Sequence, residues 1–127
     1  MSHMGLRPAI GIGIAIAAIG CSSPAPTATV GRELYASNGC ASCHGASGHG
    51  DGPVAKTLVP RPRDFRDASA FKNGTDVAAI ATTLASGLSS GGSSMPQFRH
   101  LTRDERASLA LYVISLRTSP QQSKEQP

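Results

Sequence analysis

The stretch GCASCHG, residues 39–45, places two thiols and one imidazole within five consecutive positions. Residues three and four positions apart lie on one face of a helical turn, so Cys40, Cys43 and His44 can point to the same side. Cys-x-x-Cys-His is the attachment signature of c-type haem. In that arrangement two thioether bonds hold the edge of the porphyrin while the adjacent imidazole reaches its iron. We therefore predict one covalently bound haem c, with His44 as the proximal ligand.

Three other chemistries use two nearby cysteines, and each fits these residues less well. A zinc site of Cys40, Cys43, His44 and His49 is disfavoured because Cys43 and His44 are adjacent, whereas structural zinc sites separate their two ligand pairs. A thioredoxin-type redox pair needs a βαβ unit, and the sequence shows no strands for one. A disulfide across only two intervening residues would be strained. Haem attachment remains the leading interpretation.

The composition indicates one small domain that needs help to fill its core. The chain has 127 residues, with 14 Gly, 9 Pro, no Trp, and 3 Phe and 2 Tyr as its only aromatics. Small domains bury a modest share of their surface and often depend on a disulfide, a metal or a cofactor. The net charge of +4 comes from 12 Lys and Arg interspersed with 8 Asp and Glu. Because nucleic-acid binders gather their cations on one face, we predict no nucleic-acid partner.

The N-terminal region has the composition of an export signal. The opening MSHM resembles a cloning scar, which accounts for residues 1–3, and the apolar run 8–20 has the length of a signal peptide rather than of a membrane span. The run ends in small residues before Cys21, which resembles the lipobox of bacterial lipoproteins. We predict a signal peptide over 1–20 and lipidation of Cys21. Ordinary signal cleavage, which would leave Cys21 as a free thiol or remove it, is the alternative.

Two polar segments flank the folded part of the chain. Residues 21–29 hold the lipid-anchor cysteine and a stretch rich in Pro, Ser and Thr, which is typical of a flexible tether. Residues 119–127 are too polar to order themselves, so we predict a disordered tail. The folded domain is therefore expected over 30–118.

Three segments of this domain carry helical periodicity. The first covers 30–38 and ends at an Asn-Gly pair, and the second covers 75–87 with Thr75 as its cap. The third follows Thr102, which forms a capping box with Glu105. The stretches between them are dense in Gly, Ser and Pro, which predicts loops without regular structure. The predicted fold class is all-α, with three main helices and long loops packed around the haem.

A six-coordinate haem needs a second axial ligand, and a thioether suits a haem used for electron transfer. Met95 is the only methionine outside the N-terminal segment that we expect to be removed. It lies in a loop rich in Gly and Ser, and Pro96 favours an extended conformation that can aim the Met95 side chain inward. We predict Met95 as the distal ligand, with His100 as the backup.

Together these features resemble the bacterial class I cytochromes c that carry a single haem, and the resemblance covers residues 30–118. In that family the first and last helices cross, with a glycine that allows close approach and aromatic residues that lock the contact. Gly31 and Tyr35 match the positions on the first helix, and Leu109 and Tyr112 match those on the last. The resemblance therefore implies the small class I cytochrome c fold.

The same resemblance implies further residues around the haem. A Gly-Pro pair after the haem motif supplies, in this family, the carbonyl that accepts the Nδ1 proton of the proximal histidine, and Pro53 matches it. Arg61 and Arg63 are candidates for bonding the haem propionates, because guanidinium groups suit partly buried carboxylates; a solvated basic loop is the alternative. Residues 50–65, GDGPVAKTLVPRPRDF, resemble a subset of periplasmic monohaem cytochromes that contain a Pro-Arg-Asp-Phe stretch.

A second basic cluster, Arg99, Arg103 and Arg106, lies near the start of the last predicted helix, where positive charge is unfavourable. It is either a solvated face or part of a basic collar around the haem edge that steers an acidic partner.

An iron whose axial positions are both filled has no open site for a substrate, and the sequence shows no catalytic constellation. We predict a one-electron carrier between membrane-associated redox partners, and no enzyme. We expect an exported monomer that is lipid-anchored through Cys21 on the periplasmic side of a bacterial membrane. The alternatives are a haem-based sensor or small-ligand binder in which Met95 is displaced, and a permanent subunit of a larger respiratory or photosynthetic complex.

Overall fold

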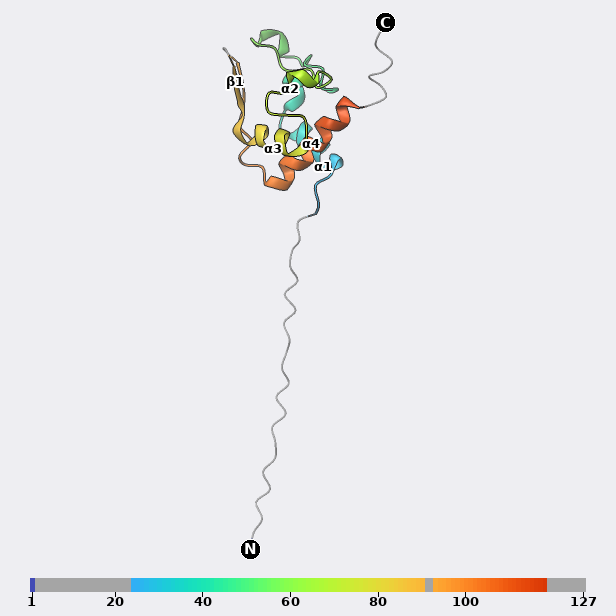
Figure 1. Ribbon diagram of the computed structural model, residues 1–127, viewed down its shortest axis with the longest axis vertical. Coiled ribbons are helices and arrows are strands. Elements are labelled where there is room, and N and C mark those ends of the chain that lie inside the picture. Colours follow the sequence, from blue (N-terminus) through green and yellow to red (C-terminus); the bar gives the residue numbers. More distant parts are fainter. Residues whose placement is uncertain (2–23, 91–92, 119–127) are drawn as a thin grey trace.

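The structure, a computed structural model, describes residues 1, 24–90 and 93–118. Over these residues the chain is mainly helical, with one two-stranded sheet (Figure 1). The elements are α1 (Ala28–Ser37), α2 (Cys40–His44), the 3₁₀ turns η1 (Ala55–Thr57) and η2 (Ala68–Ala70), α3 (Val77–Ser86), β1 (Leu88–Ser90), β2 (Ser93–Met95) and α4 (Arg103–Arg117). The predicted all-α class is confirmed. The predicted signal peptide, the anchor at Cys21 and the tail 119–127 lie outside the described residues.

The crossing of α1 and α4 forms the centre of the fold. A side-chain carbon at Gly31 would collide with the backbone carbonyl of Ser108 on α4, so only glycine allows the two helices to approach this closely. One turn further along α1, the ring of Tyr35 meets Tyr112 edge-on, with ring centroids 5.3 Å apart. The backbone N–H of Thr27 also donates to the Ser108 hydroxyl at 3.1 Å. The predicted crossing through Gly31, Tyr35 and Tyr112 is confirmed.

This crossing makes Gly31→Ala destabilising. Alanine favours a helix over glycine by about 1 kcal/mol, but the added carbon meets backbone atoms of α4 that cannot rotate away. Overpacking of this kind costs about 1–3 kcal/mol, so after the gain in helix propensity we expect a net loss of about 1 kcal/mol, and at most about 2 kcal/mol, in the free energy of unfolding. Chemical denaturation would measure the loss. Thr29→Ala, at an exposed position of the same helix, is the control and should change stability little.

Side-chain caps begin α1, α3 and α4, and one of them lies a residue away from its predicted position. The cap of α3 is Asp76, whose carboxylate accepts from the backbone N–H of Ala79 at 2.9 Å, so the prediction of Thr75 is wrong. The capping box of α4 is confirmed. The Thr102 hydroxyl accepts from the Glu105 N–H at 3.2 Å, and the Glu105 carboxylate accepts from the Thr102 N–H at 2.7 Å.

The stretch after α3 is more regular than its composition indicates. The strands β1 and β2 pair antiparallel, with Leu88 opposite Met95 and Ser89 opposite Ser94. The prediction of an irregular loop is therefore wrong here. In the sequence Gly91 and Gly92 lie between the paired segments.

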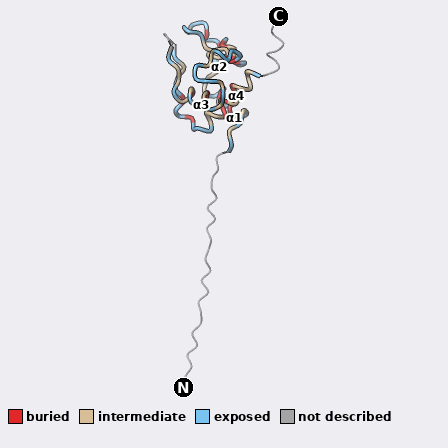
Figure 2. Tube along the Cα trace, in the orientation of Figure 1, coloured by how far each residue is buried: buried red, intermediate tan, exposed pale blue. Residues whose placement is uncertain are grey.

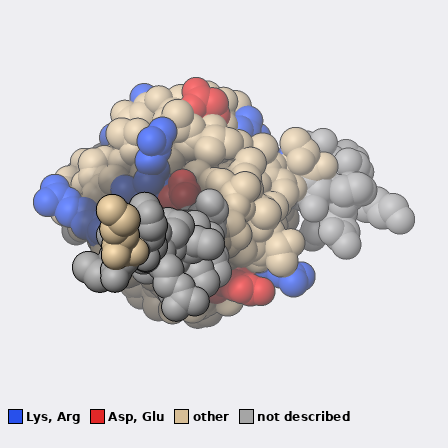
Figure 3. All heavy atoms as spheres, turned by 90° about the horizontal axis from the view of Figure 1, so that it is seen from below, with Lys and Arg blue, Asp and Glu red and all other residues tan. Residues whose placement is uncertain are grey.

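The core lies where α1 and α3 pack against α4, and further buried residues lie in the stretch after α2 (Figure 2). Its buried hydrophobic members come from these helices and from two loops: Tyr35, Phe65, Ile80, Leu84, Phe98, Leu101, Leu109, Ala110 and Val113. Charged side chains are spread over the surface. On the face shown in Figure 3, Lys and Arg stand at separate places with Asp and Glu between them.

Candidate functional site

The site is a cavity of about 440 Å³, a volume within the range of small-molecule and cofactor pockets. Cys40, Cys43 and His44 line it from α2, and Met95 lines it from the end of β2. The structure therefore brings together the four residues singled out by the haem motif and by the search for a distal ligand.

The remaining wall of the cavity is largely apolar. Four aromatic rings and several aliphatic side chains contribute to it, among them Tyr35, Phe65, Phe71, Phe98, Ile80, Leu84 and Val113. The charged side chains on the lining are Arg61, Arg63 and Lys72, all of them cations, and among the described residues no acidic side chain joins them. Such a cavity suits a flat apolar molecule that carries anionic groups at one edge.

A single helical turn presents the motif. Gly39 adopts the left-handed conformation (φ 70°) and caps α2, which lets the chain turn sharply from α1 into the haem motif. Beyond α2 the chain folds back, and the N–H groups of Gly50 and Gly52 donate to the carbonyls of His44 (2.9 Å) and Cys43 (3.1 Å). The carbonyls at the end of this short helix are thereby satisfied.

The two cysteines are free thiols, and both are half-buried. Burial raises the pKa of the Cys40 thiol to about 11. The hydroxyl of Tyr35, which also lines the cavity, donates to the Gly45 carbonyl at 2.7 Å and ties α1 to the end of the motif. Burial raises the pKa of Tyr35 as well, so this hydroxyl stays protonated.

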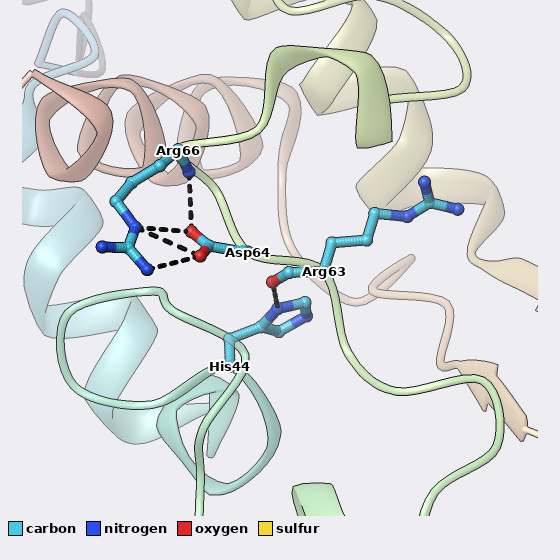
Figure 4. A network of polar contacts seen from close by, with 4 residues as sticks. All are labelled: His44, Arg63, Asp64 and Arg66. Atoms are coloured by element: carbon cyan, nitrogen blue, oxygen red, sulfur yellow. Dashed lines mark hydrogen bonds and ion pairs between the residues drawn. The ribbon is translucent and has the colours of Figure 1, made fainter.

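The imidazole of His44 is held by a backbone carbonyl. Its Nδ1 lies 3.2 Å from the Arg63 carbonyl oxygen, and because a carbonyl can only accept, Nδ1 carries the proton (Figure 4). Nε2 is then left with its lone pair, which is the form that binds a metal. Burial lowers the pKa of His44, which favours this neutral form. The ring also stacks on Phe65, with centroids 4.7 Å apart.

This geometry corrects the prediction for Pro53. The acceptor of the His44 proton is Arg63, whereas Pro53 is exposed and does not line the cavity. The reason is the path of the chain: the segment after α2 turns its N–H groups onto the carbonyls of that helix, and the later segment around Arg63 passes beside the imidazole.

The segment that supplies this carbonyl is stabilised immediately after Arg63. The Phe65 N–H donates to the Gly48 carbonyl at 2.7 Å, and Arg66 forms a forked ion pair with Asp64 that is 2.6 Å at its shortest. The hydrogen bond from the Arg66 side chain lowers the pKa of Asp64. In Figure 4 the side chain of Arg63 extends away from His44, and it reaches the cavity lining, as does Arg61.

The surroundings of the cavity also correct the prediction for His100. His100, the backup ligand, does not line the cavity; its Nε2 lies 3.0 Å from the side-chain oxygen of Asn38. Arg99, Arg103 and Arg106 do not line the cavity either, and Arg106 donates to backbone carbonyls.

Several further residues of the cavity wall were not predicted from the sequence. Phe65 and Phe71 pack on each other at the cavity wall, and Asn38 and Lys72 contribute to its lining. The Pro-Arg-Asp-Phe stretch was a signal for Phe65, whereas nothing local distinguishes the others. Within the described part of the chain no three His, Cys, Asp or Glu side chains are arranged to hold a metal ion.

The residues present fit a covalently held haem. The cavity is lined by two free thiols, an imidazole with an Nε2 lone pair, a thioether, apolar side chains and three cations. A family model described as Cytochrome c matches residues 28–117. The chain belongs to the cytochrome c family. Members of this family bind haem c covalently and transfer electrons, and this cytochrome has the small helical fold that goes with that function.

Among solved structures, this cytochrome is similar to a chain of the Kuenenia stuttgartiensis reducing HAO-like protein complex Kustc0457/Kustc0458. The two are 28% identical with a TM-score of 0.58, and the match covers 86% of this chain and 50% of the other. The match thus spans only half the length of that chain. No curated protein matches the sequence.

Proposed function

We propose that this cytochrome carries one haem c and acts as a one-electron carrier, with His44 and Met95 as axial ligands. The observation that carries the proposal is the shared cavity, which Cys40, Cys43 and His44 line from α2 and Met95 lines from β2. The sequence contains a single Cys-x-x-Cys-His motif, which supports one haem per chain. A His/Met pair leaves no axial position open, which favours electron transfer over binding of a substrate.

Each part of the site has a task in this proposal. Cys40 and Cys43 supply the sulfur atoms for attachment, and His44 Nε2 ligates the iron while the Arg63 carbonyl fixes the ring and raises its basicity. Bound haem supplies an iron that cycles between its ferric and ferrous states. Arg61 and Arg63 donate to the propionates from the cavity lining.

The walls of the cavity and the ligand set both act on the reduction potential. Apolar side chains disfavour the more highly charged ferric state, and a thioether ligand raises the potential relative to a second nitrogen. We expect a carrier with a fairly high potential.

Location and partners follow from the N-terminal sequence. We propose export to the periplasmic side of a bacterial membrane and anchoring through lipids on Cys21. A tether confines the monomeric carrier to the membrane surface, where it raises the effective concentration of membrane-associated redox partners. No helix within the described residues is long and apolar enough to cross a membrane. Nucleic acid has no part in the proposal.

The number of haem groups is the direct test of the proposal. Protein exported by a host with haem-maturation machinery should show one covalent haem per chain by intact mass and by the absorbance of its pyridine derivative. Redox titration should give a single one-electron transition. A chain without haem, or one that releases all of its haem on denaturation, would contradict the proposal.

A second candidate is a subunit that stays bound within a larger complex. It is favoured by the similarity to a chain from the Kustc0457/Kustc0458 complex, of which the match covers only half. Purification from the native membrane separates the two candidates. A carrier elutes alone at the size of a monomer, whereas a subunit elutes with partners in fixed ratio.

A further inference from the structure

The segment that follows Met95 is fastened to the rest of the protein before α4 begins. The Phe98 N–H donates to the Leu84 carbonyl on α3 at 2.8 Å. The side chain of Phe98 is 8% exposed, lines the cavity and packs in the core together with Leu101. Only Pro96 and Gln97 separate Met95 from this anchored residue. The position of Met95 therefore depends on how firmly residues 98–101 are held.

Arg106, in the first turns of α4, forms hydrogen bonds to two carbonyls of this segment. Its half-buried guanidinium donates through Nη1 to the Leu101 carbonyl and, at 3.4 Å, to the Phe98 carbonyl. A cation near a helix N-terminus is unfavourable in itself, so the hydrogen bonds to these two carbonyls explain why an arginine occupies this position. Hydrogen bonds from a charged donor are stronger than neutral ones, particularly where water is partly excluded.

Arg103 provides a contrast on the same helix. It is exposed, and in the described part of the chain it has no hydrogen bond to residues 98–101. The two arginines have the same charge and lie within one turn of each other, yet of these two described residues only Arg106 hydrogen-bonds to the segment that follows Met95.

We propose that Arg106 is a positioning residue for Met95. By holding the carbonyls of Phe98 and Leu101, it limits how far the adjacent backbone can move and so keeps the Met95 thioether in the cavity. This inference rests on the proposed ligation by His44 and Met95. It assigns a role in ligand retention to an arginine that does not line the cavity.

Binding of imidazole to the exported ferric holoprotein tests the proposal. Imidazole binds only when Met95 has left the iron, so its affinity reports the population of the open state. We expect Arg106→Leu to bind imidazole about tenfold more tightly than wild type, which corresponds to about 1.4 kcal/mol. Arg103→Leu should stay within about twofold of wild type. Amide hydrogen exchange of Phe98 should become faster in Arg106→Leu only.

An Arg106→Leu protein with the imidazole affinity of wild type would overturn the proposal, even if its melting temperature fell, because that result describes a purely structural residue. If Arg106→Leu does not fold, Arg106→Gln decides in the same assay, since its amide is uncharged and its side chain is shorter than that of arginine. Met95→Ala distinguishes failure of this proposal from failure of the proposed ligation by His44 and Met95. If its imidazole affinity equals that of wild type, Met95 is not the ligand and the proposed ligation has failed.

Discussion

Without the thiols of Cys40 and Cys43, the exported protein is expected to contain no covalently bound haem and to lose its cooperative unfolding transition. The first effect is chemical, because the thioether bonds need both sulfur atoms. The second follows from the fold. Side chains of the core, including Leu84 and Phe98, also line the cavity, so the haem is expected to complete the core from inside.

The size of the cavity indicates how much stability the protein loses without haem. Cavities left in protein cores cost about 24 cal/mol per Å³, which for 440 Å³ amounts to roughly 10 kcal/mol. The cavity reaches solvent beside exposed residues such as Arg61 and Lys72, so the true cost is lower. Even half of that value is comparable with the whole stability of a small domain, which is about 5–15 kcal/mol.

The test uses the Cys40→Ser/Cys43→Ser double variant from a maturation-competent host. Acidified organic solvent should extract all of its haem, and circular dichroism should show no sharp thermal transition. Ser42→Ala is the matched control, because Ser42 lies between the two cysteines with an exposed side chain and should leave attachment intact. Haem that stays with the double variant after extraction would refute attachment through these thiols.

The second large effect is expected for Met95→Ala. Removing the thioether opens the sixth position of the iron, so the ferrous protein should bind carbon monoxide stoichiometrically, whereas wild type should bind almost none. The reduction potential should fall, because a thioether ligand favours the ferrous state. The spectral change on adding carbon monoxide to the reduced protein measures the binding.

Ser94→Ala is the control for this variant. Ser94 precedes Met95 in β2 and lines the same cavity, but its hydroxyl is not a proposed ligand. Carbon monoxide binding by wild type as strong as that of Met95→Ala would show that the sixth position is already open. The haem-based sensor would then describe the protein better than the carrier.

The sequence predicts the parts of this protein that depend on local patterns. The helical turn that carries Cys40, Cys43 and His44 follows from spacing, and the capping box of α4 follows from Thr102 and Glu105. The helix crossing at Gly31 was implied by the resemblance to class I cytochromes c, in which a glycine on the first helix allows the close approach. The cap of α3 was misplaced by one residue because Thr75 and Asp76 are both good capping residues.

The predictions that failed concern hydrogen-bond partners, which are determined by contacts between distant segments. Every residue has a carbonyl, so the sequence does not show that Arg63 rather than Pro53 accepts the His44 proton. An arginine side chain is long, so a cluster such as Arg99, Arg103 and Arg106 does not show which member turns inward. His100 is a good ligand by type, yet the fold pairs it with Asn38.

The absorption spectrum of the exported, oxidised wild-type protein tests the central claim most directly. Ligation by His44 and Met95 predicts a low-spin ferric spectrum with the weak far-red band that reports a bond between sulfur and iron. A high-spin spectrum, or a low-spin spectrum without that band, would contradict the claim, because the iron would then be open or bound by a different ligand.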